Sequence, residues 1–297
     1  MPSRKRLSRM KSNSLAQYFL NEGMMSLEQM EPMLSKMRNR EIQLPVIALR
    51  QRMVDPCVLD EMHASGGKDF AKEAVEKNLL TSAQVEQLRQ ETGGESLHFA
   101  QYLLDEDILT YAELDVYFRE REHMKELPVH YAVRRLCGER LAKERAVYSD
   151  FMEIFMDSLM DFLHTPAVIS LEPVSEIEFT SGFATHAASQ HMNGDVSIVT
   201  GILAEDAEFL ELAGRYSEED LTEIDEIAID SIQEYLNVIN GIYSIQLAER
   251  SIDVELEVPR WGAVVIPQGH RQLIMQVCTD FGTIYVIVSS DEFIGQT

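Results

Sequence analysis

Residues 14 to about 125 contain an internal repeat that constrains the fold of the first half of the chain. In each copy an apolar pair is followed at once by a short polar side chain that can cap a helix. The pairs start at Met24, Met53, Leu79 and Ile108, and the polar residues are Ser26, Asp55, Thr81 and Thr110. Each copy therefore predicts a helix, a tight corner and a second helix. Hairpins of this size cannot bury their apolar faces alone, so we expect four of them to stack into an all-α module over 14–125.

The ends of this module are marked by changes in composition. Residues 1–13 are basic and have no apolar stretch of signal-peptide length behind them, which predicts a disordered tail. Residues 126–140 are predicted to be a linker, and residues 141–297 a second domain.

The second domain mixes helical and strand patterns. An amphipathic helix is predicted from Val147 to Phe162, and a longer one further along the chain. Strands are predicted at Ala167–Glu172, Phe183–Ser189, Val196–Leu203, Ile252–Val258, Gly262–Pro267, Arg271–Asp280 and Gly282–Ser289. The expected fold class is α+β, with an antiparallel sheet and two long helices on one face.

The longer helical pattern runs from Glu218 to about Arg250, with Ser217 predicted as its N-cap. A helix turns about 100° per residue, so positions can be assigned to its faces. One broad side carries Ile227, Ala228, Tyr235, Val238, Ile239 and Ile242. An arc of about 60° on the other side carries Asp230, Glu234, Asn237 and Gly241. An acid and an amide one turn apart thus point the same way. The glycine beside them has no side chain, so a partner could approach the helix closely there. A solvated polar stripe is the alternative interpretation.

This spacing resembles the signature of the CheC/CheX/FliY family of chemotaxis phosphatases. The signature is Asp or Ser, three residues, Glu, two residues, Asn, three residues, Gly, and a later Pro. It is matched here by Asp230, Glu234, Asn237, Gly241 and Pro259. The resemblance covers about the second half of the chain, and the single copy is CheX-like. Tyr235 and Leu236 stand where the family usually has apolar and small residues, and could narrow the approach.

The resemblance implies an enzyme that hydrolyses the aspartyl phosphate of a CheY-type response regulator. Asn237 would orient the attacking water, and Glu234 would dock to the regulator's lysine. Asp230 would assist docking, Gly241 would let the partner approach, and Pro259 would shape the facing strand. The magnesium ion would come from the regulator, so no cofactor of its own is expected. A homodimer is expected by the same resemblance. The alternative is a non-catalytic adaptor that binds a receiver domain and links it to motility or secretion machinery.

The helical repeats resemble the N-terminal modules of type II secretion and pilus ATPases, some of which bind cyclic di-GMP. That ligand pattern needs an arginine and a glycine, but the matching positions hold His98 and Ala100 in the last copy. Without the guanidinium fork, phosphate recognition lacks its best donor. We therefore expect docking or regulation from this module.

The composition excludes several other classes. A formal net charge of −24 and a pI near 4.6 argue against a nucleic-acid partner. Three cysteines without a CxxC pair fit a reducing cytoplasm and give no zinc site. His186 and His191 lie five apart in a predicted strand, on opposite faces, which defeats chelation. No apolar run reaches the ~18–20 residues that span a bilayer.

Overall fold

The computed structural model describes residues 14–38, 40–66, 69–90, 95–174, 186–263 and 269–291. The tail predicted over 1–13 lies outside these ranges. So do residues 183–185 and 264–267, which belong to two of the predicted strands.

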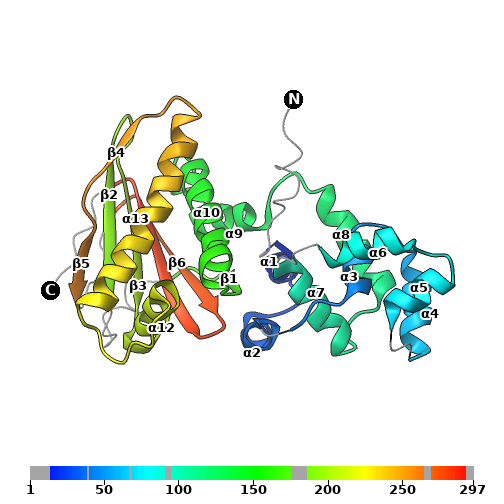
Figure 1. Ribbon diagram of the computed structural model, residues 1–297. Helices are drawn as coiled ribbons and strands as arrows, with labels where there is room; N and C mark the ends of the chain where they lie inside the picture. Colours follow the sequence, from blue (N-terminus) through cyan, green and yellow to red (C-terminus); the bar gives the residue numbers. More distant parts are fainter. Residues whose placement is uncertain are drawn as a thin grey trace.

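The first half of the chain folds into the four predicted helical hairpins (Figure 1). They are α1 (Ser14–Asn21) with α2 (Leu27–Arg38), α3 (Leu44–Arg50) with α4 (Pro56–Ala64), α5 (Phe70–Glu76) with α6 (Ser82–Arg89), and α7 (Glu95–Asp105) with α8 (Tyr111–Glu122). Their buried apolar side chains form one cluster, so the prediction that the hairpins share a core is confirmed.

The cap prediction is confirmed at all four corners. Ser26 Oγ accepts the Gln29 N–H at 3.3 Å, and Asp55 accepts the Cys57 N–H at 2.9 Å. Thr81 and Thr110 each form a capping box with the third residue of the following helix. The residue before each apolar pair has a positive φ, between 53° and 68°, which turns the chain sharply. These residues are Gly23, Arg52, Asn78 and Asp107.

The second half contains an antiparallel sheet of seven strands in the order β1-β6-β7-β3-β2-β4, with β5 also paired to β2. The strands are β1 (Ala167–Ile169), β2 (His186–Gly194), β3 (Ile198–Ala204), β4 (Val254–Leu256), β5 (Arg260–Ala263), β6 (Gln272–Thr279) and β7 (Gly282–Ser289). The β2–β3 and β6–β7 hairpins supply the centre of the sheet, and β1 lies at one edge.

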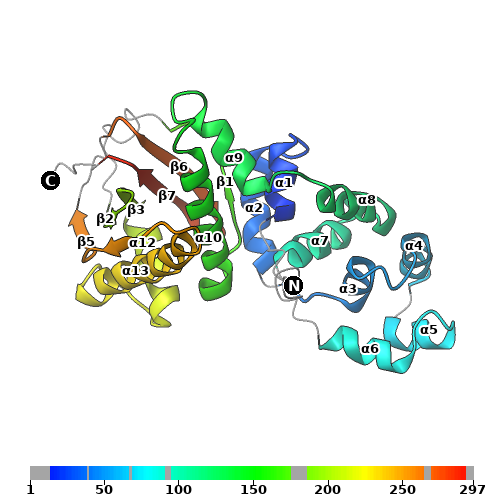
Figure 2. The same cartoon turned by 90° about the horizontal axis from the view of Figure 1, so that it is seen from above.

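Helices cover one face of this sheet (Figure 2). They are α10 (Arg145–Leu163), the short α12 (Asp206–Ser217) and α13 (Glu226–Ala248). Their apolar side chains share a core with the inward residues of the strands. The predicted α+β class with two long helices on one face is therefore confirmed.

The helical hairpins meet the sheet at its β1 edge. The Gln17 side chain donates to the Ile169 carbonyl at 3.0 Å and accepts the Ile169 N–H at 2.7 Å, so its amide takes the place of a neighbouring strand. Asn21 donates to the Pro128 carbonyl at 2.9 Å. That proline begins α9 (Pro128–Cys137), a helix within the range predicted as a linker, and its apolar side packs against α10. The domain boundaries themselves stay a prediction.

The predicted start of the long helix is wrong. Ser217 ends α12, and Glu218 follows it with a φ of 58°, a left-handed conformation that stops the helix. The long helix begins at Glu226, where the Asp225 side chain accepts the Ala228 N–H at 3.0 Å. The acidic run after Ser217 therefore lies in the connection, whereas Asp230, Glu234, Asn237 and Gly241 stay on one continuous helix.

Candidate functional site

Four of the five signature residues lie on the side of α13 that faces away from the core. Asp230 and Glu234 are exposed, Asn237 is half-buried, and Gly241 lies in the same row two turns after Glu234. A methyl group added at Gly241 would meet no atom within 4 Å. The fold therefore does not need a glycine there for space, and the surface at this point is open.

The Glu234 carboxylate has no cationic partner among the residues that the structure describes. Within the described ranges, no Lys, Arg or His forms an ion pair with it. Its Oε2 accepts a long hydrogen bond of 3.5 Å from Nδ2 of Asn237. Burial and the charge of Glu234 both raise the pKa of Tyr216, the aromatic neighbour on α12. An exposed carboxylate without a cation is available to pair with a cation on another molecule.

Asn237 is held from below by the sheet. Its Oδ1 accepts a hydrogen bond of 2.8 Å from Nε2 of Gln190, a fully buried residue of β2. The same Gln190 Nε2 donates to the Glu257 carbonyl at 2.8 Å. Gln190 Oε1 accepts from Nδ2 of Asn240, which also bonds Thr200 of β3. A chain of hydrogen bonds thus runs from the sheet interior to the candidate amide.

Tyr235 and Leu236, between the acid and the amide, do not obstruct the site. Both side chains are 0% exposed and point into the core. The Tyr235 hydroxyl shares a 2.8 Å hydrogen bond with Ser158 of α10, and burial raises the pKa of that phenol. The narrowing considered from the sequence therefore does not occur.

Pro259 lies in an irregular segment beside α13. Between the pairs Met192–Leu256 and Ser189–Arg260, the β4–β5 segment has one residue more than β2. This extra residue makes a bulge, a place that tolerates a proline without an N–H. The Pro259 carbonyl accepts a 3.0 Å hydrogen bond from Gln233 Nε2 of α13. The bulge also leaves Val258 82% exposed, next to the candidate site.

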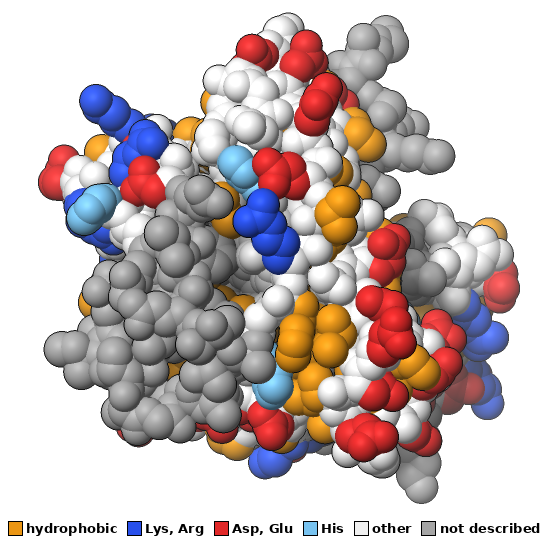
Figure 3. Space-filling view, turned by 90° about the vertical axis from the view of Figure 1, so that its left-hand side faces the viewer, with side chains coloured by type: hydrophobic (Ala, Val, Ile, Leu, Met, Phe, Trp, Pro, Cys, Tyr) orange, Lys and Arg blue, Asp and Glu red, His pale blue; other side chains and the backbone are white. Residues whose placement is uncertain are grey.

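Apolar side chains flank the polar row, and part of the predicted helical wheel is wrong here. The helical wheel predicts Ile227 and Ile242 on the apolar side, but their side chains are 50% and 40% exposed. The reason is that the buried side of the helix is centred on Ile232 and Ile239. Ile245 and Trp261 are also exposed. Figure 3 shows this side of the molecule, where apolar side chains gather beside acidic ones. An apolar surface next to an unpaired acid is typical of a protein-binding face.

The histidines of β2 contact different groups. His186 Nε2 lies 2.8 Å from Asp206, whereas His191 contacts Glu257 at 3.0 Å and Ser197 at 2.8 Å. The chain Ser197–His191–Glu257 has the residue types of an acyl-transfer triad, but Ser197 is exposed in the hairpin turn. A triad needs oxyanion donors in a water-excluded site. We therefore interpret it as a surface contact. In the parts of the chain that are described, no three His, Cys, Asp or Glu residues are grouped to hold a metal.

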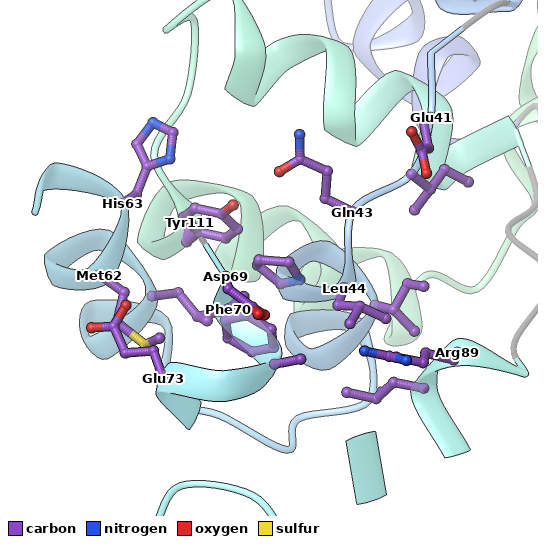
Figure 4. Close-up of a pocket in the computed structure, with 16 residues that line it drawn as sticks. Glu41, Gln43, Leu44, Met62, His63, Asp69, Phe70, Glu73, Arg89 and Tyr111 are labelled. Atoms are coloured by element: carbon purple, nitrogen blue, oxygen red, sulfur yellow. The ribbon is translucent and has the colours of Figure 1, made fainter. Parts of the chain in front are cut away.

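A cavity of about 490 Å³ lies elsewhere, among α3, α4, α5, α6 and α8 of the helical module. Figure 4 shows its polar side chains, which include Glu41, Asp69, Glu73, His63 and Arg89. Carboxylates outnumber the single arginine of the lining, so the cavity does not favour a phosphate ligand. The expectation that the module does not bind a nucleotide stays a prediction.

Several solved structures are similar in fold to about half of this chain. The CheX chemotaxis protein of Vibrio vulnificus is 15% identical with a TM-score of 0.38, over 47% of this chain and 93% of that one. CheX in a CheX–CheY–BeF3–Mg complex of Borrelia burgdorferi is 16% identical with a TM-score of 0.39, over 48% and 96%. FliY of Thermotoga maritima is 11% identical with a TM-score of 0.38, over 51% and 90%.

No family model matches the chain, and no curated protein sequence matches it. At these identities the structural likeness concerns the arrangement of helices and strands, so function has to be inferred from the residues of the site. None of the helices in the described ranges is long and apolar enough to span a membrane.

The residues that sequence reasoning missed are those behind Asn237. Gln190, Thr200 and Asn240 are 1%, 0% and 0% exposed and join three elements. Asn240 gave a usable signal, because a carboxamide on the buried side of a helix requires partners. The partners are Gln190 of β2 and Thr200 of β3, which lie 50 and 40 residues away along the chain, so spacing could not identify them.

Proposed function

We propose that this protein is a phosphatase that hydrolyses the aspartyl phosphate of a receiver domain of the CheY type. The observation that carries the proposal is the outward row on α13. It combines an unpaired carboxylate at Glu234, a carboxamide at Asn237 and open space at Gly241. The family resemblance of the same residues supports this assignment.

The reaction needs few groups from the phosphatase. A water oxygen forms a bond to phosphorus while the bond from phosphorus to the aspartate oxygen breaks. The aspartate leaves as a carboxylate, and the water proton goes to inorganic phosphate. Catalysis of such a transfer comes mainly from positioning the water in line and stabilising charge on the phosphoryl oxygens. A neutral amide suits the first task because it brings no negative charge against the phosphoryl group.

In this proposal Asn237 holds the water and Glu234 pairs with the receiver's lysine. Asp230 adds to docking at the N-terminal end of the row, and the backbone at Gly241 gives the partner close access. The magnesium ion that neutralises the phosphoryl oxygens belongs to the receiver. The exposed Ile242 and Ile245 on α13 would pack against the receiver beside this row.

We also propose a cytoplasmic location and a homodimer. Gln17 already occupies the β1 edge, so a dimer would use another surface of the molecule. Sedimentation of the full chain tests the dimer directly.

The function is tested with a CheY-type receiver phosphorylated by magnesium and a small phosphodonor. Loss of the phosphoryl group is followed with and without this protein. We expect acceleration by the wild type, a loss of kcat in Asn237→Ala with binding retained, and weaker binding in Glu234→Ala. Wild-type binding without acceleration would favour the adaptor, and neither binding nor acceleration would reject both functions.

A further inference from the structure

The buried chain Thr200–Asn240–Gln190 ends on the candidate amide, and this arrangement restricts how Asn237 can act. A carboxamide has a donor end and an acceptor end of nearly the same shape. On an exposed helix its torsion is free, and either end can point outward. At Asn237, hydrogen bonds to neighbouring residues determine which end of the amide points outward.

The orientation of the Asn237 amide follows from a backbone carbonyl, which can only accept a hydrogen bond. The Glu257 carbonyl lies 2.8 Å from the end of the Gln190 side chain, so that end has to be the amide nitrogen. Gln190 Oε1 then faces Asn240 Nδ2 at 2.8 Å, which satisfies both groups. The second N–H of Gln190 points at Asn237, which has to present its oxygen, at 2.8 Å.

We infer that Gln190 is a positioning residue that fixes the carboxamide of Asn237 with Nδ2 outward, as a donor toward the partner. Turning the amide by 180° would place two donors against each other at Gln190 and lose a hydrogen bond in a buried site. The bond of Asn240 to Thr200, at 2.8 Å, holds Gln190 from behind. This inference rests on the proposed function for its catalytic consequence, but the orientation of the amide can be measured without it.

The consequence for the reaction is a pre-oriented group. Nδ2 of Asn237 is directed away from the sheet and toward the Glu234 carboxylate, 3.5 Å away. A partner that binds Glu234 through a cation would leave this N–H₂ group free for the water or a phosphoryl oxygen. Because the torsion is fixed before binding, no rotamer search slows the step.

The test compares Gln190→Met with Gln233→Met. Methionine keeps the length of each side chain and removes its amide. Gln233 donates to the Pro259 carbonyl in the same bulged segment, at 3.0 Å, and its variant is therefore a control that loses an amide hydrogen bond to this segment and leaves Asn237 untouched. Two readouts are used: the mobility of the Asn237 side-chain N–H₂ by ¹⁵N relaxation, assigned by its disappearance in Asn237→Asp, and kcat and KM for a phosphorylated receiver.

We expect a rigid Asn237 amide in the wild type and in Gln233→Met, and a mobile one in Gln190→Met. We expect kcat to fall about tenfold or more in Gln190→Met, with KM unchanged, because the water is mispositioned while docking is kept. A mobile amide in the wild type, which needs no variant to fold, overturns the inference. So does a kcat for Gln190→Met equal to that of Gln233→Met. If the wild type has no phosphatase activity, the proposed function fails. The relaxation data alone then test whether Gln190 fixes the Asn237 amide.

Discussion

The two sides of α13 carry the same kind of side chain and use it differently. Asn240 points into the molecule, is 0% exposed, and has three hydrogen bonds of 2.8 to 3.0 Å to Gln190 and Thr200. Asn237, one turn earlier, also bonds Gln190, and within the described part of the chain its donor side has one long contact, of 3.5 Å. The inner amide has its partners within the fold, whereas the outer amide keeps a donor for another molecule.

This difference is the one expected between a structural polar group and the proposed functional one. A buried amide has to be bonded because an unpaired one costs about 1–3 kcal/mol. An amide that reaches the solvent can exchange a bound water for a group of a partner protein at little cost. Such an amide is therefore available for binding. The same contrast holds between Tyr235, which is bonded to Ser158 in the core, and the unpaired Glu234.

The largest effect on stability is expected from Asn240→Leu. The change leaves Gln190 Oε1 and the Thr200 hydroxyl without a partner and should lower the free energy of unfolding by about 2 kcal/mol. Asn237→Leu should lower it by less than about 1 kcal/mol, because it removes one hydrogen bond of a half-buried side chain and Gln190 keeps its bonds to Asn240 and the Glu257 carbonyl. Urea unfolding followed by the fluorescence of Trp261, the only tryptophan, measures both. Equal losses would remove the distinction between the two amides.

The next effect concerns binding. Glu234→Ala should weaken binding to a receiver activated with magnesium and beryllofluoride about tenfold, because it removes one member of a charge pair. The effect should shrink at high salt. Glu249→Ala, which removes an exposed acid at the other end of α13, serves as control. Equal affinities of the two variants by titration calorimetry would show that Glu234 is not the docking acid.

A smaller effect is expected on the inner side. Tyr235→Phe removes the hydrogen bond to Ser158 and should cost about 1 kcal/mol of stability. It should leave the phosphatase rate unchanged, because the ring is buried away from the partner. Thermal unfolding and the dephosphorylation rate are measured on the same preparation. A fall in rate without a fall in stability would place Tyr235 in the site after all.

The smallest effect on stability has the opposite sign. Gly241→Ala should stabilise the protein by about 0.5–1 kcal/mol, because alanine is the better helix former and the space around Gly241 is open. A longer side chain, in Gly241→Leu, should weaken receiver binding by projecting from the docking face. Unchanged receiver affinity in Gly241→Leu would mean that the partner does not approach this surface.

Local signals in the sequence predicted much of this structure. The caps at Ser26, Asp55, Thr81 and Thr110 depend on neighbours two or three residues away, and all four are present. The outward placement of Asp230 and Glu234 follows from helix geometry alone. These features need no knowledge of distant contacts.

Features that depend on tertiary packing were harder to predict. The wheel placed Ile227 and Ile242 inward, but the direction of the buried side is set by where the sheet lies, and both are exposed. Glu218 adopts a left-handed conformation that ends α12, and the long helix starts only at Glu226, after the Asp225 cap; periodicity reveals neither feature. Gln190 reaches Asn237 across 47 residues of chain, through a sheet register that no short pattern encodes.

The most direct measurement is an NMR titration of the ¹⁵N-labelled full chain with a CheY-type receiver. The receiver is added once with magnesium and beryllofluoride and once without them. We predict that the activated receiver shifts the signals of the outward face of α13, including the Asn237 side-chain amide and the Glu234 backbone, and that the inactive receiver does so only weakly. Shifts confined to the helical hairpins, or the same response to both forms, would contradict the account.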